Sequence, residues 1–338
     1  MASRAVRPVA AVVRKGLRSA ARNQPRVRGM MAAVARELAR ALDDDVYGAS
    51  YFGSGRDPLD RMGLSGYERY DRDSSNANVA AYLVWRWFEV TRTLDVGCAT
   101  GFVVEALREV GIDASGVDVS QYAVERAAEG ARGHIAYGDL TRRLHVPDRS
   151  YDLVTVLETL EHLPPSAVHH AVEELRRVTR GYVVATIPSF GPNHNGPGGW
   201  FNAKVRDERV PHYQSLGPGF RGPIPYDDLY RDARGEPIEG HLTIASFDWW
   251  TERFTEAGFL RCDRVERAMH PHLARFGLTK YWNLYVFRVP GAAEPGPDVR
   301  TPEEITAREA QWGLDRRRAA AEDLQAVALA LGRTSGAG

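Results

Sequence analysis

The sequence predicts an α/β fold built on a doubly wound, mostly parallel sheet. From Thr91 onward, short apolar segments alternate with amphipathic helical patterns, and this order is typical of parallel strands covered by helices on both faces. The first of these strands runs into the segment TLDVGCATGF, residues 93–102, where small residues stand at alternate positions before a helix. With 338 residues, 43% of them apolar, the chain can bury a substantial core without disulfides.

Each element follows from its local pattern, with glycines closing the first two helices of the alternation at Gly111 and Gly130. A helix over 78–90 should pack on the core before the alternation begins. Strands are then expected over 91–97, 113–120, 133–139, 151–158 and 181–189, and helices over 102–111, 121–130 and 165–179. A helix over 247–258 and two late strands over 259–268 and 280–289 complete the core.

The composition changes along the chain divide it into regions. We expect a basic N-terminal extension over 1–45, an N-terminal cover and helix over 46–90, the main domain over 91–290, and a C-terminal helical extension over 291–338. Within the main domain, residues 191–240 hold nine glycines and seven prolines among aromatic residues. This stretch is too long for an ordinary connection and is interpreted as a lid insertion.

Charge and cysteine usage limit the classes of partner. The first 36 residues carry nine basic residues and no acid, which predicts a loosely ordered extension, with weak peripheral contact to an anionic membrane as the alternative. The formal net charge is zero, so nucleic acid is not an expected partner. No apolar run approaches the roughly 20 residues of a membrane span. Cys98 and Cys262 form no ligand pattern, which favours a reducing, cytoplasmic location.

The small-residue turn indicates a nucleoside cofactor. The G-x-G-x-x-G pattern of dinucleotide sites is incomplete, because Phe102 stands at its third glycine position. Asp118 closes the second strand, 21 residues beyond Gly97, where a carboxylate can accept both hydroxyls of a ribose. Asp139 ends the third strand and could accept from an adenine amino group.

Four segments in this order resemble the class I S-adenosylmethionine-dependent methyltransferases, of the type 11/12-like kind. They are LDVGCATG, GVDVS, YGDL and YDLVTVLETLEHLPP, with Ala99 at the place of the usual middle glycine. The resemblance implies a seven-stranded Rossmann-like methyltransferase sheet, with S-adenosyl-L-methionine as cofactor and S-adenosyl-L-homocysteine as product. It implies that the cofactor-binding residues are Asp95, Gly97, Cys98, Ala99, Gly101, Asp118, Val119, Asp139, Leu140 and Glu158.

The segment LETLEHL places candidate catalytic residues where the methyl group should point. Methyl transfer to a hydroxyl requires alignment and removal of a proton, and histidine is the natural base near neutral pH. Glu161 and His162 are therefore candidates, although His162 could instead only pack, and His241 is a second candidate. A divalent metal on Asp227 and Asp228 with a loop histidine is left open but not favoured.

Aromatic residues in and after the insertion suggest the acceptor. Trp200, Tyr226 and Trp249 would suit stacking on a sugar ring, so we expect O-methylation of a sugar or glycosylated small molecule in a bacterial glycan or natural-product pathway. A phenol or quinone-type acceptor is the first alternative, and a non-catalytic S-adenosylmethionine-binding assembly protein is the second. The C-terminal helices are expected to pack on the domain or on a second subunit in a homodimer.

Overall fold

The structure, a computed structural model, describes residues 47, 51–52, 70–199, 204–231, 240–278, 283–296 and 299–322. The basic extension predicted over 1–45 lies outside the described residues, and so does Trp200. In the part of the chain that is described, none of the helices combines the length and apolar character that crossing a bilayer requires.

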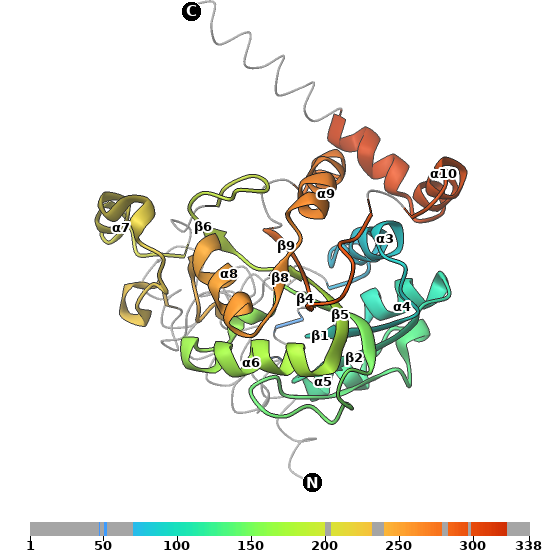
Figure 1. Cartoon of the computed structure of the whole chain (residues 1–338), viewed down its shortest axis with the longest axis horizontal. Helices are drawn as coiled ribbons and strands as arrows, with labels where there is room; N and C mark the ends of the chain where they lie inside the picture. Colours follow the sequence, from blue (N-terminus) through green and yellow to red (C-terminus); the bar gives the residue numbers. More distant parts are fainter. Residues whose placement is uncertain are drawn as a thin grey trace, which may run out of the picture.

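A seven-stranded sheet forms the centre of the molecule, in the order β3-β2-β1-β4-β5-β9-β8 (Figure 1). Its strands are β1 Arg92–Val96, β2 Asp113–Asp118, β3 Ile135–Tyr137, β4 Tyr151–Leu157, β5 Thr179–Thr186, β8 Leu260–Arg261 and β9 Leu284–Arg288. The first five strands pair in parallel, whereas β9 runs antiparallel to both β5 and β8. The predicted doubly wound sheet is confirmed, and its strand order changes direction between β1 and β4.

Helices cover the sheet from both faces. They are α3 Ala77–Trp87, α4 Phe102–Glu109, α5 Gln121–Glu125, α6 Pro165–Val178, α8 Phe247–Glu256 and α9 Asp263–Arg275. Two further helices, α7 Val210–Leu216 and α10 Pro302–Gln311, belong to the insertion and to the C-terminal region. Leu153 packs in one apolar cluster with α3, α4 and α9, while its neighbour Val154 packs in another with α6 and α8. Because successive strand residues point to opposite faces, the two clusters are the two sides of the core.

Two predicted elements differ from the structure. The helix predicted over 121–130 ends at Glu125, because the chain turns so that Ala128 N donates to Thr100 O and a short 3₁₀ turn follows at Glu129–Ala131. The strand predicted over 259–268 is paired only at Leu260–Arg261 and continues as α9. Val265, Met269 and Leu273 recur at helical spacing and are buried, so tertiary packing favours the helix.

The insertion that follows β5 encloses a small apolar cluster of its own. It is closed at its base by a two-stranded sheet, β6 Ser189–Phe190 paired in parallel with β7 Ala245–Ser246. The cluster consists of Phe190, Val205, Tyr213, Ile224, Leu229 and Ile244. This small core, with α7 on it, means that the aromatic and branched residues here bury largely against each other.

The described C-terminal helices pack on the domain. Thr301 and Glu304 form a reciprocal capping box that begins α10, and residues 314–322 are helical again. Trp312 and Leu314 are buried in the cluster that contains α3. Figure 1 shows α10 near α3 and α9, and the buried Tyr82 hydroxyl donates to Glu309.

Candidate active site

A cavity of about 330 Å³ opens at the carboxyl ends of three neighbouring strands. Val96 ends β1, Asp118 ends β2 and Leu157 ends β4, and all three residues line the cavity. This is the position beside the change in strand order where open α/β sheets bind ligands. Its volume is in the range of small-molecule sites.

The small-residue turn after β1 forms one wall. Gly97 and Ala99 line the cavity with φ angles of 76° and 49°, whereas Gly101 does not line it. A Cβ on Gly97 would lie 2.2 Å from Thr159 Oγ1, and one on Gly101 would lie 2.7 Å from Ala131 Cβ. The close approach that the sequence predicts at these glycines is therefore made by neighbouring protein atoms.

Two of the predicted cofactor residues lie behind this wall. Cys98 packs in the main core, its Sγ 2.6 Å from where a Cβ on Gly116 would lie. Asp95 is buried, does not line the cavity and accepts a hydrogen bond from Thr155 Oγ1 at 2.6 Å. Burial raises the pKa of Asp95 to about 7, and the negative charge of Asp118 adds to this rise.

Asp118 connects the turn to the end of β2. One carboxylate oxygen accepts from Ala99 N and the other from Ser120 N, both at 2.7 Å. These bonds fix the carboxylate at the cavity wall, beside Val119, which is 40% exposed. A fixed carboxylate at this strand end can still accept from ligand hydroxyls, because each oxygen has two acceptor sites.

Asp139 and Leu140 follow β3 in the chain and also line the cavity. Asp139 Oδ1 accepts from both the backbone N and the hydroxyl of Thr141, and Oδ2 pairs with Arg142 at 3.3 Å. Leu140 is buried and offers an apolar surface. Together with Asp118 and Val119, these residues make one polar and one apolar contact surface of the kind that a nucleoside requires.

Aromatic side chains also line the cavity, and we call them the aromatic collar. The collar consists of Tyr47, Tyr51, Phe52 and Tyr70. His162, Glu158 and Thr159 line the cavity beside it, and the His162 ring meets Tyr47 and Tyr51 edge to face at 5.7 and 6.2 Å. Sequence reasoning missed the collar, although the tyrosines of VYGASYF were a signal that the cover carries ring contacts.

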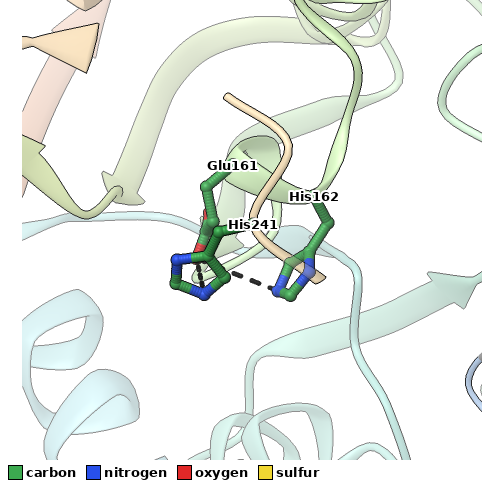
Figure 2. Close-up of side chains that lie close together, drawn as sticks. All are labelled: Glu161, His162 and His241. Carbon is green, nitrogen blue, oxygen red and sulfur yellow. Dashed lines mark ion pairs between the residues drawn. The ribbon is translucent and has the colours of Figure 1, made fainter. Parts of the chain in front are cut away.

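The three candidate catalytic residues lie together, and we call them the Glu–His–His cluster: Glu161, His162 and His241 (Figure 2). The Oε1 atom of Glu161 is 4.0 Å from His162 Nε2 and 3.9 Å from His241 Nε2. Glu161 is fully buried, and the side chains of His162 and His241 are 11% and 10% exposed. Burial lowers the pKa of His241 well below its usual value, and the nearby His162 and Lys204 charges act in the same direction.

Backbone hydrogen bonds hold the return of the insertion against this cluster. The carbonyl of Glu161 accepts from Leu242 N at 2.8 Å and from Thr243 N at 2.9 Å. His162 Nδ1 lies 3.2 Å from the carbonyl oxygen of Gly240. The segment 240–243 thereby brings His241, 79 positions after His162 in the chain, to the same site.

Trp249 and Tyr226, two of the aromatic residues predicted to contact the acceptor, lie away from the cavity. Trp249 is 8% exposed and packs edge-on against Trp250 in the core cluster of α6 and α8. Tyr226 is 40% exposed, with the Arg231 guanidinium over its ring. Neither residue lines the cavity, because Trp249 points inward from α8 and Tyr226 outward from the insertion.

The metal site that the sequence suggested on Asp227 and Asp228 does not form, because both carboxylates are held by other side chains. Asp227 pairs with Arg231 and is 90% exposed, while Asp228 is bound by Arg209 and by the Tyr213 hydroxyl. Among the described residues, the group of histidine, cysteine and carboxylate side chains close enough to hold one ion is the Glu–His–His cluster.

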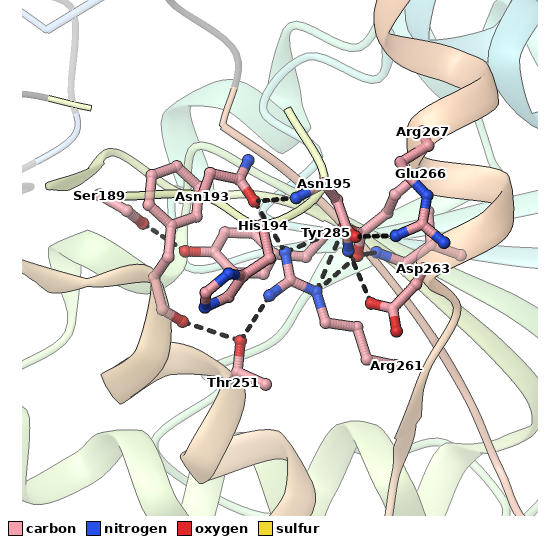
Figure 3. A network of polar contacts seen from close by, with 12 residues as sticks. Ser189, Asn193, His194, Asn195, Thr251, Arg261, Asp263, Glu266, Arg267 and Tyr285 are labelled. Carbon is pink, nitrogen blue, oxygen red and sulfur yellow. Dashed lines mark hydrogen bonds and ion pairs between the residues drawn. The ribbon is translucent and has the colours of Figure 1, made fainter. Parts of the chain in front are cut away.

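A buried polar network fixes the start of the insertion to the core (Figure 3). Glu266, on α9, accepts from Arg261 Nη2 at 2.9 Å, from Asn195 Nδ2 at 2.6 Å and from Val286 N at 2.8 Å. Burial raises the pKa of Glu266, and the Arg261 guanidinium opposes this rise. Since Asn195 belongs to the insertion and Val286 to β9, the network joins the two.

Comparison with known proteins locates the similarity in the sheet. Residues 94–184 match the family described as "Methyltransferase domain". The ubiquinone biosynthesis O-methyltransferase of Methylococcus capsulatus is 34% identical over 92 residues, which are 25% of this chain and 39% of that protein. The enzyme of the same name from Alkalilimnicola ehrlichii is 37% identical over 105 residues, covering 29% of this chain and 42% of its own length.

The similarity to these relatives is therefore partial. The chain spans about two fifths of the length of the curated relatives that it matches (39% and 42%). A solved S-adenosylmethionine-dependent methyltransferase from Archaeoglobus fulgidus aligns with a TM-score of 0.39 at 17% identity, over 64% of this chain and 94% of that one.

Proposed function

Residues 94–184 belong to the class I S-adenosylmethionine-dependent methyltransferases, and from this premise we propose that the protein transfers a methyl group from S-adenosylmethionine to a hydroxyl of a small molecule. The observation that carries the proposal is a single cavity lined by two chemically different sets of side chains. Carboxylates at strand ends form one set, and an imidazole with four aromatic rings forms the other.

Among the lining residues, we assign Asp118 to the two ribose hydroxyls of the cofactor, and Asp139 with Leu140 to its adenine. Asp118 is supported by its fixed orientation, since both its oxygens are already held by backbone N–H groups. Glu158 has a φ of 48° and lines the cavity next to Thr159, which suits a contact with the methionine part.

For the acceptor, we propose a planar phenol or quinol. The aromatic collar offers ring edges and faces, which suit a flat apolar ring better than a hydroxyl-rich sugar. The relatives named above carry ubiquinone biosynthesis in their names, which favours the same acceptor class. The sugar acceptor expected from the sequence depended on Trp200, Tyr226 and Trp249; Trp200 lies outside the described residues, and neither Tyr226 nor Trp249 lines the cavity.

The chemistry required is an in-line displacement. The acceptor oxygen loses its proton and attacks the methyl carbon, the carbon–sulfur bond breaks, and sulfur keeps the electron pair as a neutral thioether. His162 is an imidazole that lines the cavity, so we assign it to activating the acceptor hydroxyl. Alignment by the collar contributes through orientation, because methyl transfer depends strongly on the approach angle.

The proposal is tested by calorimetry and a methyl-transfer assay on the full chain. We expect S-adenosylhomocysteine to bind, and Asp118→Ala to weaken binding by about 1.5–3 kcal/mol, the range for hydrogen bonds to a charged group. Asp113→Ala is the matched control, since Asp113 begins the same strand with its side chain 59% exposed. Equal affinity of the two variants would remove the ribose assignment.

Catechols, hydroquinols and matched glycosides are then offered with labelled S-adenosylmethionine. We expect label in the phenolic compounds, and His162→Ala to lower turnover by about 10²–10⁴ with cofactor affinity retained. Label in the glycosides alone would reject the phenol or quinol acceptor, and no label with any hydroxyl compound would reject the activity.

A further inference from the structure

The spacing inside the Glu–His–His cluster fits an ion better than hydrogen bonds. The two N···O separations of 4.0 and 3.9 Å exceed hydrogen-bond length. Two ligand atoms that bind one tetrahedral ion at about 2.0–2.2 Å are separated by roughly 3.4 Å. The three ligand atoms lie within 4.8 Å of one another, so shifts of less than about 1 Å in each side chain bring them to one ion.

The backbone around the cluster is built before any ligand arrives. The two N–H groups of Leu242 and Thr243 bind the Glu161 carbonyl, and the Thr243 hydroxyl donates to Leu163 O at 2.6 Å. These bonds fix the segment carrying His241 against the turn that carries Glu161 and His162. A preformed scaffold reduces the ordering that ion binding would otherwise require.

The histidine orientation has the form that metal ligands need. His162 Nδ1 can donate to the Gly240 carbonyl at 3.2 Å, which leaves Nε2 with its lone pair directed at the cluster. A backbone carbonyl that receives the second ring N–H is the usual support of a ligating histidine.

We propose that Glu161, His162 and His241 bind a divalent transition-metal ion of the Zn²⁺, Co²⁺ or Mn²⁺ class, with an open position toward the cavity. Two imidazoles and one carboxylate suit these ions, whereas Mg²⁺ and Ca²⁺ favour sites composed of oxygen ligands. His162 lines the cavity, so the cluster lies against the cavity wall. His241 lies outside residues 94–184, so one ligand comes from beyond the matched domain.

This inference rests on the proposed function and deepens it. A bound ion would supply Lewis acidity at the acceptor oxygen, lowering the pKa of a phenolic hydroxyl so that its proton leaves to solvent. The oxygen then attacks the methyl carbon as described above, and the balance of atoms and charge is unchanged. Glu161 and His241, neither of which lines the cavity, would act by holding the ion.

The test uses the full chain, stripped with dipicolinate and then titrated with Co²⁺, Zn²⁺, Mn²⁺ and Mg²⁺ separately. We expect one Co²⁺ per chain, with the visible absorption of a low-symmetry nitrogen–oxygen site, and displacement of Co²⁺ by Zn²⁺. His241→Ala should weaken Co²⁺ binding by more than about 100-fold, because loss of a ligand exceeds the 10–100-fold typical of loss of a supporting contact.

Two further variants make the result specific. His169→Ala is the control, since His169 is an exposed histidine on α6 that pairs with Glu173, and its Co²⁺ affinity should equal that of the wild type. His241→Cys keeps a ligand and should retain Co²⁺ with an added thiolate-to-metal absorption band. This variant remains informative if His241→Ala does not fold.

The proposal is overturned if Co²⁺ and Zn²⁺ bind no more tightly to the wild type than to His241→Ala, or if Mg²⁺ alone binds. In either case His162 would act as a base without an ion. S-adenosylhomocysteine titration separates the two proposals: cofactor binding without metal binding rejects only this inference, and metal binding without cofactor binding rejects the proposed function.

Discussion

At position 97, both the backbone conformation and the close contact with Thr159 require a glycine. The φ of 76° is in the left-handed region, and an added Cβ would meet the Thr159 hydroxyl oxygen at 2.2 Å. We expect Gly97→Ala to move the Thr159 turn, which lines the cavity, and to lower cofactor affinity by about tenfold or more, alongside a backbone cost of about 1–3 kcal/mol in unfolding free energy.

Gly111→Ala is the matched control for this change. Gly111 has a φ of 81°, and no atom lies within 4 Å of its added Cβ, so it carries the backbone cost without the contact. Calorimetric titration of both variants isolates the contact with Thr159. Equal losses of cofactor affinity would contradict the steric argument.

Asp95 makes the folded state sensitive to pH. Its pKa is raised to about 7 in the folded protein, against about 3.9 in an unfolded chain, so the folded state holds an extra proton between these values. Stability associated with this proton is present below pH 4 and is lost as the pH rises through 7. Asp95→Asn removes the titration and can still accept the Thr155 hydrogen bond at its side-chain oxygen.

We therefore expect Asp95→Asn to stabilise the protein more at pH 8 than at pH 4, with a difference on the order of 2–4 kcal/mol in unfolding free energy. Urea denaturation of the wild type and the variant at both pH values measures this difference directly. A difference that does not change with pH would show that the pKa of Asp95 is the same in the folded and unfolded states.

At the scale of elements, the insertion combines its own apolar cluster with a direct connection to the cluster of candidate catalytic residues. Tyr213, on α7, is 4% exposed, donates to Asp228 and packs with Ile244, which follows the segment 240–243. We expect Tyr213→Ala to loosen the insertion, so that hydrogen exchange over 204–231 rises and methyl transfer falls. Cofactor affinity should be retained, because the residues assigned to the cofactor lie on other elements.

Leu216→Ala is the control on the same helix, since Leu216 is 44% exposed and its loss leaves no cavity. Unchanged methyl transfer in Tyr213→Ala, with raised exchange, would separate the insertion from the reaction and leave it as a structural element. The closure of the insertion over the acceptor, expected from the sequence, stays a prediction, and hydrogen exchange with and without acceptor tests it.

At the scale of the whole molecule, the C-terminal helices complete the core on the face of α3 and α4. Trp312 is 7% exposed, and its indole N–H donates to Glu109 Oε2 at 3.0 Å. We expect Trp312→Ala to lower the unfolding free energy by about 3–5 kcal/mol, as for other buried large-to-small changes. Cofactor affinity should stay constant where the variant is folded, since Trp312 does not line the cavity.

Gln311→Ala, at an exposed position next to Trp312, should leave the unfolding free energy within about 0.5 kcal/mol of the wild type. Guanidinium denaturation monitored by circular dichroism compares the two variants. A loss below 1 kcal/mol in Trp312→Ala would mean that the C-terminal helices are dispensable for the fold.

The sequence by itself determined the sheet and the strand ends that line the cavity. Alternating apolar segments and helical patterns are local signals, and the residues at Gly97, Asp118 and Asp139 follow strands directly, so their meeting at one edge follows from parallel pairing. Local signals failed where packing decides: residues 263–268, predicted as part of a strand, begin α9.

Only the tertiary structure decided which residues distant in the chain join these strand ends. His241 joins Glu161 and His162 through backbone hydrogen bonds across 80 residues, and the aromatic collar comes from the cover that precedes the sheet. Trp249 and Tyr226 carry the same ring chemistry as the collar, yet one packs into the core and the other faces solvent. Residue type and spacing cannot distinguish these outcomes, because the direction of a side chain depends on contacts with elements distant in the chain.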